Sequence, residues 1–179
     1  MYRVADNDFD VVSAQLELFD RTAENVVCWG VRIIGKSRGG REGAAAWNPA
    51  ILADVLLETQ PGQIASWHDI GGTTVRWDEP NDDPQALFEA YETQPIYNCT
   101  VQFVKDGPRL RLLLKGMVYI DSDYQDVAIE LDTPLTVAPW PMGDDSEQQC
   151  LARYAQLGFT DPVEFRVIDD VSSLVFLNQ

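Results

Sequence analysis

Alternating hydrophobic and polar positions recur along the chain and predict β-strands. Residues 11–19 alternate apolar and polar side chains, whereas residues 26–34 form an apolar run that is rich in β-branched residues. The first pattern predicts a strand with one buried face, and the second predicts a strand covered on both faces. Because residues 20–25 between them are polar, we expect the two strands to form a hairpin.

A second alternating region predicts three consecutive antiparallel strands. Residues 96–105 alternate, a tight turn follows at residues 105–108, and residues 109–120 alternate again. Gly116 interrupts this second strand and predicts a bulge or bend there. The third strand follows a polar turn and places Val127, Ile129 and Leu131 on one face. We therefore expect a meander over about residues 96–132, and further short strands at 163–167 and 174–177.

Three segments have the pattern of helices. Asn48 and Pro49 suit a helix start, apolar residues at 51, 52, 55 and 56 form a stripe, and residues 61–62 suit a helix end. Asp83 and Pro84 predict a second, short helix through residue 91. Residues 146–149 resemble a capping box, and Gly158 suits the end of the third helix.

Together these elements predict a single α+β domain over residues 1–179. We expect a mostly antiparallel sheet with about three helices packed on one side. The chain is long enough to bury a sizeable core, and its hydrophobic fraction of 45% is ordinary for a folded protein.

The net charge of the chain limits the kinds of molecule that it is expected to bind. The chain has 29 acidic and 13 basic residues, a formal net charge of −16. Such a charge repels nucleic acid and anionic membranes and attracts cationic partners. The basic residues gather in two islands, residues 21–41 and 101–116. If these islands lie together on the sheet, the protein has two electrically distinct faces.

The location of the protein is predicted from what the sequence lacks. Residues 1–10 contain no apolar leader, and no stretch approaches 18 apolar residues. The three cysteines are an odd number, which favours reduced thiols over a disulfide framework. We therefore predict a cytoplasmic protein.

No catalytic motif withstands inspection. Residues 30–37 match the spacing G-x-x-x-x-G-K-S/T, but the intervening Val, Arg, Ile and Ile are typical of a strand and not of a phosphate loop. His68 is the only histidine, and Asp69 beside it is poorly placed to orient it. Residues 121–126 lack the glycine and glutamate of a calcium loop. We predict no catalytic residues, no metal and no cofactor.

Two segments remain candidates for ligand binding. Residues 66–78 combine aromatic and polar side chains around a Gly-Gly pair, which suits a pocket or, alternatively, a hairpin with both tryptophans in the core. The candidate pocket residues are Trp67, His68, Asp69, Arg76 and Trp77. The basic, glycine-rich segment 35–43 is either a solvated loop or a recognition loop for an anionic group.

These observations favour a non-enzymatic acidic binding protein, of the inhibitor, immunity or antitoxin type, that neutralises a basic protein such as a toxin or a nucleic-acid-acting enzyme. The alternatives are a small-molecule-binding module or enzyme built on residues 66–78, and an accessory subunit of a larger assembly. The sequence leaves the oligomeric state open. We expect the partner to contact acidic residues among Asp78, Glu79, Asp82, Asp83, Asp121, Asp123, Asp126, Asp144, Asp145 and Glu147.

Overall fold

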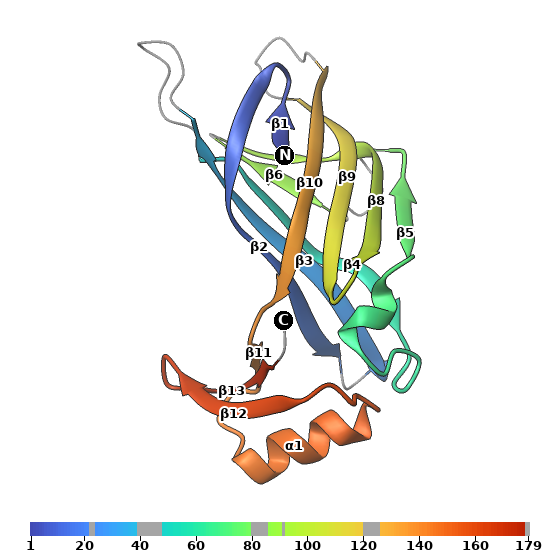
Figure 1. Cartoon of the computed structure of the whole chain (residues 1–179), viewed down its shortest axis with the longest axis vertical. Coiled ribbons are helices and arrows are strands. Elements are labelled where there is room, and N and C mark those ends of the chain that lie inside the picture. The colour runs from blue at the N-terminus through green and yellow to red at the C-terminus, as the bar shows by residue number, and fades with distance from the viewer. Residues whose placement is uncertain (22–23, 39–47, 80–85, 91, 120–125, 178–179) are drawn as a thin grey trace.

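The protein consists mainly of antiparallel strands. The computed structural model describes residues 1–21, 24–38, 48–79, 86–90, 92–119 and 126–177. Within these ranges the strands form a ten-stranded sheet, in the order β5-β8-β9-β10-β1-β2-β3-β4-β6-β7, and a three-stranded sheet, in the order β11-β13-β12 (Figure 1). One α-helix and one short 3-10 helix complete the described elements.

The strands of the large sheet range in length from 3 to 15 residues. In chain order they are β1 (Tyr2–Val4), β2 (Asn7–Arg21), β3 (Val26–Ser37), β4 (Ala50–Thr59), β5 (Thr74–Trp77), β6 (Leu87–Glu89), β7 (Thr93–Pro95), β8 (Tyr97–Asp106), β9 (Arg109–Tyr119) and β10 (Asp126–Val137). The 3-10 helix η2 (Trp67–Ile70) precedes β5.

The large sheet is rolled, and Ile96 joins the edge strand β7 to β8, which lies next to the opposite edge strand. Strands β7 and β8 are joined through this single residue, although they lie near opposite ends of the strand order. Strand β7 contacts β9 across this seam. Ile96 is fully buried, and its N–H donates to the carbonyl oxygen of Ala86 at 3.0 Å. The chain itself therefore holds the roll closed.

Side chains fill the inside of the roll. The inward positions of the strands are apolar, as the alternating patterns require, because alternate residues of a strand point to opposite faces. The largest fully buried side chains of the roll include Tyr2, Leu16, Trp29, Ile33, Phe88, Phe103, Leu110 and Leu112. They belong to one continuous cluster that extends into the C-terminal part of the chain.

A C-terminal layer lies across the lower end of the roll in Figure 1. We use this name for β11 (Trp140–Pro141), α1 (Glu147–Gln156), β12 (Val163–Ile168) and β13 (Val171–Phe176) with their connections. Phe159, after α1, packs edge-on against Trp29 of β3 with ring centroids 5.7 Å apart. Tyr154 and Trp140 also contact Phe159, so an aromatic cluster joins the layer to the roll.

Polar contacts reinforce this junction. The carboxylate of Asp161 accepts from the Ser66 hydroxyl at 2.6 Å and from the Trp67 N–H at 2.9 Å, and so caps η2. On the other side, Arg153 of α1 forms an ion pair with Asp20 at the end of β2. The layer is therefore tied to the roll at two separated places.

The helix predicted at residues 49–61 is wrong, because this segment is strand β4. Between the pairs Val31–Ala53 and Trp29–Leu57 the register shifts, so three residues of β4 lie opposite Gly30. This bulge moves the buried positions from Ile51 and Ala53 to Leu56. A strand whose inward phase shifts midway imitates the spacing of an amphipathic helix.

The second predicted helix is also wrong where the structure describes it. Residues 87–89 form strand β6, which pairs with β4, and residues 83–85 and 91 lie outside the described residues. The third helix is confirmed as α1, with the Ser146 N–H donating to the Gln149 side chain at 2.9 Å. The expected α+β domain with three helices is therefore corrected to a mostly antiparallel β-fold with one α-helix among the described residues.

The predicted hairpin and meander are confirmed. Strand β2 pairs with β3, and β8, β9 and β10 are consecutive neighbours. Gly116 does lie at a bulge, but the extra residue belongs to β8, where the register shifts between Tyr97 and Thr100. A side chain at Gly116 would collide with Ile96, because a Cβ there would lie 2.6 Å from the Ile96 Cγ2 atom.

Gly30 is the first position where we predict a large loss of stability. A Cβ at this residue would lie 2.4 Å from the Ala53 carbonyl oxygen and 2.6 Å from that of Asp54. Because these are backbone atoms of the bulge, Gly30→Ala should lower the free energy of unfolding by about 2–3 kcal/mol. Urea denaturation checks this value.

The control is Gly107→Ala, in the β8–β9 turn. Gly107 has a φ of +60°, and the position that a methyl group would take beside it is open space. Its substitution should cost only about 1 kcal/mol, the strain of a left-handed alanine. Equal losses for the two variants would contradict the role assigned to the bulge.

Tyr2 offers a prediction of the opposite sign. Its ring packs beside Phe9 and under Gly35, and its hydroxyl is buried without a hydrogen-bond partner among the described residues. Burial raises the pKa of this phenol, which therefore stays neutral. Because an unpaired buried hydroxyl costs about 1–3 kcal/mol, Tyr2→Phe should leave the protein as stable or more stable. A lower thermal midpoint for this variant would show that the hydroxyl is in fact satisfied.

Candidate functional site

The segment 66–78 does not gather its candidate pocket residues around one opening. Trp67 and Trp77 are 1% and 5% exposed and pack into the core. The indole N–H of Trp77 donates to the Ile96 carbonyl oxygen at 2.6 Å. Both tryptophans therefore lie in the core, as the alternative predicted, but Gly71 and Gly72 connect η2 to β5 and do not form the expected hairpin.

The polar members of this segment point elsewhere. His68 stacks on Trp67 with ring centroids 3.6 Å apart, while Asp69 is exposed and lies 3.9 Å from the Lys105 ammonium group. Arg76 precedes the buried Trp77 in β5 and is exposed. Since neighbouring strand residues point to opposite faces, Arg76 and Trp77 do not line a common site.

The predicted acidic contact residues are divided between the two ends of the molecule. Asp78 and Glu79 follow β5, and Asp126 begins β10, at the upper end of the roll in Figure 1. Asp126 accepts a hydrogen bond from the Tyr97 hydroxyl, whose pKa is raised by burial and by this bond. Asp82, Asp83, Asp121 and Asp123 lie outside the described residues.

The remaining three contact residues, Asp144, Asp145 and Glu147, lie in the C-terminal layer. The N–H of Met142 donates to the Ser172 carbonyl oxygen at 2.7 Å, and the Ser172 N–H donates to that of Gly143 at 2.9 Å. These bonds hold the segment before α1 against the start of β13. The turn between β12 and β13 lies just before Ser172 in the chain.

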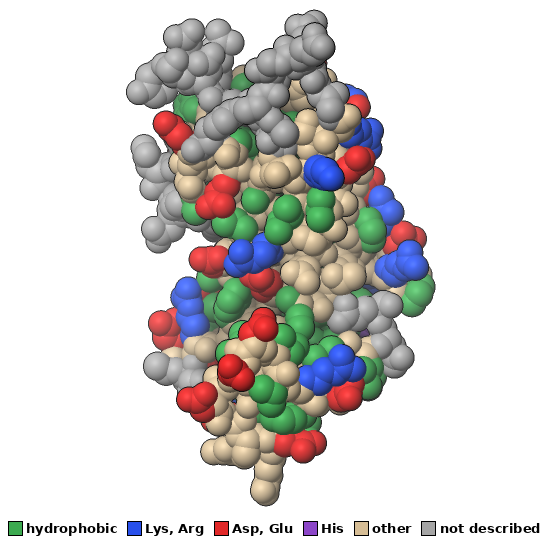
Figure 2. All heavy atoms as spheres, turned by 90° about the vertical axis from the view of Figure 1, so that its left-hand side faces the viewer, with side chains coloured by type: hydrophobic (Ala, Val, Ile, Leu, Met, Phe, Trp, Pro, Cys, Tyr) green, Lys and Arg blue, Asp and Glu red, His purple; other side chains and the backbone are tan. Residues whose placement is uncertain are grey.

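Five carboxylates consequently gather at one end of the C-terminal layer. We call Asp144, Asp145, Glu147, Asp169 and Asp170 the acidic patch. All are exposed except Asp145, which is half-buried. Among the described residues, none of the five forms an ion pair with Lys or Arg. Figure 2 shows acidic side chains over the lower part of this side of the molecule, with hydrophobic ones between them.

Carboxylates of the rolled sheet are in a different situation, because many face a cation on a neighbouring strand. Lys115 pairs with Glu130 at 3.2 Å, Arg32 with Glu17 at 2.8 Å, and Arg38 with Asp10 at 2.7 Å. The two basic islands are also separated, since β10, β1 and β2 lie between β9 and β3. They do not form one basic face, and their charge is largely balanced locally.

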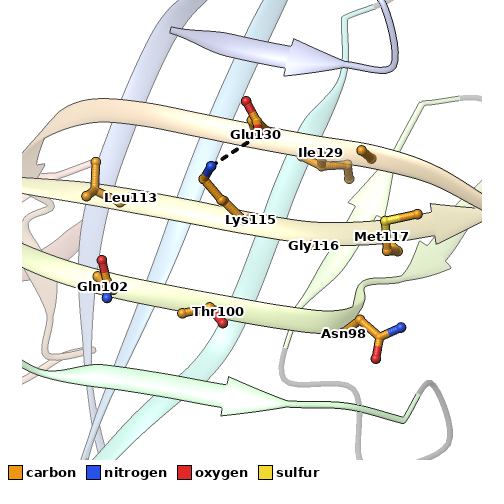
Figure 3. A pocket seen from close by; sticks show the side chains of 10 residues that line it. Asn98, Thr100, Gln102, Leu113, Lys115, Gly116, Met117, Ile129 and Glu130 are labelled. Carbon is orange, nitrogen blue, oxygen red and sulfur yellow. Dashed lines mark hydrogen bonds and ion pairs between the residues drawn. The ribbon is translucent and has the colours of Figure 1, made fainter.

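A shallow hollow of about 430 Å³ lies on the outer face of β8, β9 and β10. Asn98, Thr100 and Gln102 line one side, and Leu113 and Met117 line the middle (Figure 3). The ion pair between Lys115 and Glu130 joins β9 to β10 on the side opposite β8 (Figure 3). Its open shape and balanced charges give it no group poised for chemistry. No sequence motif marks it, and one of its lining residues, Asn98, lies at the bulge of β8 with a φ of +45°.

Other motifs have structural roles. Residues 30–37, which matched the spacing of a phosphate loop, lie within the continuous strand β3. The strand therefore includes residues 35–37, which we had expected to begin a loop over 35–43, and residues 39–43 of that segment lie outside the described residues. Cys28, Cys99 and Cys150 are free and buried, and burial raises the pKa of Cys99 to about 12. Within the described ranges, no three metal-binding side chains converge. No described helix has the length and apolar character needed to cross a membrane.

The architecture thus defines a rolled antiparallel sheet carrying a small α/β layer with an acidic patch. Comparison of the sequence with protein-family models found no matching family, and comparisons with curated proteins and with solved structures likewise found no match.

Two residues of the acidic patch have a positive φ, a backbone conformation that glycine adopts more readily than aspartate. Asp169 and Asp170 have φ values of +51° and +64° in the two-residue turn between β12 and β13. Glycine suits the second position of such a turn best. Asp170→Gly should therefore raise the free energy of unfolding by about 0.5–1 kcal/mol. Thermal denaturation checks this value. The control is Asp144→Gly, which removes a charge without relieving strain at positive φ. An equal gain in stability for both variants would indicate relief of charge repulsion instead.

Proposed function

We propose that this protein is a non-enzymatic binding protein whose acidic patch contacts a cationic protein partner. The observation that carries the proposal is a contrast within the described residues: the sheet pairs many of its carboxylates with cations, whereas none of the five carboxylates of the acidic patch has such a partner. Unpaired carboxylates close together repel one another, and an incoming cationic surface relieves that repulsion.

The rigidity of the surroundings supports the same proposal. The patch is carried by the start of α1 and by a hairpin turn, and both belong to the layer that Phe159, Asp161 and Arg153 hold against the roll. A preorganised surface loses little conformational entropy on binding. More of the favourable electrostatic energy between complementary charges therefore remains as binding affinity.

The kind of partner follows from the chemistry of the patch. Lys- and Arg-rich surfaces occur on proteins that act on nucleic acid, and a protein with a charge of −16 attracts them from a distance. We propose an inhibitor or immunity-type role, in which the acidic patch covers such a basic surface. The net charge of the protein and the acidic patch support this role.

The test is capture of partners from extracts of the cells that encode the protein, at low and at high salt. The wild-type chain should retain a basic protein at low salt in a closed one-to-one complex, and lose it at high salt. Asp144→Lys combined with Asp169→Lys should weaken this complex at least tenfold by calorimetry.

The matched control is Asp6→Lys combined with Asp54→Lys. Both residues are exposed carboxylates outside the C-terminal layer, Asp6 in the turn between β1 and β2 and Asp54 in β4, and the net charge changes by the same amount. The control should bind nearly as well as the wild type. If the two double variants lose affinity equally, overall charge governs the interaction and the patch is not the contact surface.

A further inference from the structure

Strand β12 leaves one edge of the small sheet open. In the strand order β11-β13-β12 it is the outer strand, and within the described residues it pairs only with β13. The N–H of Leu177 donates to the Pro162 carbonyl oxygen, which marks Pro162 as a residue that bonds inward. Because the bonding direction alternates along an antiparallel strand, Glu164, Arg166 and Ile168 also bond inward.

The backbone groups of the intervening residues therefore face outward. These residues are Val163, Phe165 and Val167, and no described backbone group bonds to their N–H or carbonyl groups from outside the β12–β13 ladder. Val163 and Phe165 pack against the hydrophobic core, but the Val167 side chain is 63% exposed. The open edge thus combines unpaired backbone groups with an uncovered apolar side chain.

The acidic patch lies at one end of this edge. Val167 is followed within three residues by Asp169 and Asp170, while the Glu164 and Arg166 side chains neutralise each other at 2.6 Å. An edge strand with exposed apolar surface invites pairing with another strand, and natural proteins usually block such edges with charge. Here the charge is of one sign and sits beyond the end of the strand, so it selects a partner and does not block the edge.

We propose that β12 binds an extended, basic segment of the partner as an added β-strand. The segment would donate and accept backbone hydrogen bonds at Val163, Phe165 and Val167, place an apolar side chain on Val167, and bring Lys or Arg to Asp169 and Asp170. A second copy of this chain is a poor occupant, because each copy carries a charge of −16. This inference rests on the proposed function and adds to it the form of the partner.

A synthetic peptide of alternating lysine, threonine and valine, with blocked ends, serves as the probe. Its control has the same sequence and charge but N-methyl groups on alternate residues, on the edge that would face β12, so that it cannot form the ladder. We expect the wild-type protein to bind the first peptide at least tenfold more tightly than the N-methylated one. Hydrogen exchange at the Phe165 and Val167 amides should slow only with the first peptide.

Two protein variants separate backbone pairing from side-chain contact. Val167→Pro removes an outward N–H and leaves the ladder to β13 intact, whereas Val167→Thr keeps that N–H with a similar shape. The proline variant should bind the peptide at least tenfold more weakly, and the threonine variant nearly as well as the wild type. Circular dichroism and thermal melting test whether the proline variant is folded. If it is unfolded, the comparison of the two peptides on the wild-type protein alone tests strand addition.

The outcomes distinguish this inference from the proposed function. If both peptides bind equally and Val167→Pro has no effect, strand addition is excluded, while loss of binding in the Asp144→Lys, Asp169→Lys variant would still support the patch as a cation-binding surface. If neither peptide binds, strand addition of a basic segment is also excluded. If the natural partner's binding is insensitive to the patch reversal, the proposed function itself fails.

Discussion

Closure of the rolled sheet at Ile96 is the constraint on which the rest of the structure depends. A single buried residue joins two strands that lie near opposite ends of the sheet, so inward and outward faces are defined everywhere on the roll. The glycine at 116 gives Ile96 the room that it needs. Apolar side chains can then collect inside, and the aromatic cluster around Phe159 covers the lower end of the roll.

The distinction between the inward and outward faces of the roll also determines where charged side chains lie. On the outer face of a sheet, neighbouring strands bring side chains within reach of each other, so cations and carboxylates pair across strands. The C-terminal layer has few cations, and both of its arginines are already engaged, Arg153 with Asp20 and Arg166 with Glu164. The acidic patch is therefore a product of topology: the surplus of carboxylates remains where no cationic strand runs alongside in the described part of the chain.

Local patterns along the sequence predicted most strands and one helix correctly, but they gave two wrong helices and did not predict long-range placement. The strands on either side of residues 20–25, the meander and the helix after Ser146 follow from periodicity and capping, which act over a few residues. The strand at 50–59 was mistaken for a helix because its bulge opposite Gly30 is specified by a partner strand. In the same way Asp144, Asp145 and Glu147 were predicted as contacts, but Asp169 and Asp170 were not. Their proximity depends on the bonds between Met142, Gly143 and Ser172, which no sequence spacing reveals.

The position of β1 has a consequence for how the protein is made. This first strand lies in the middle of the large sheet, with Tyr2 paired to Leu131 on one side and to Phe9 on the other. A ribosome must therefore release almost the whole roll before β1 can pair with its second partner, β10. Contacts of such long range make folding slow, and the open strands are exposed to aggregation in the meantime. The strands that are translated first are thus candidate clients for chaperones. The fold can be completed only after the residues through Val137 have been translated.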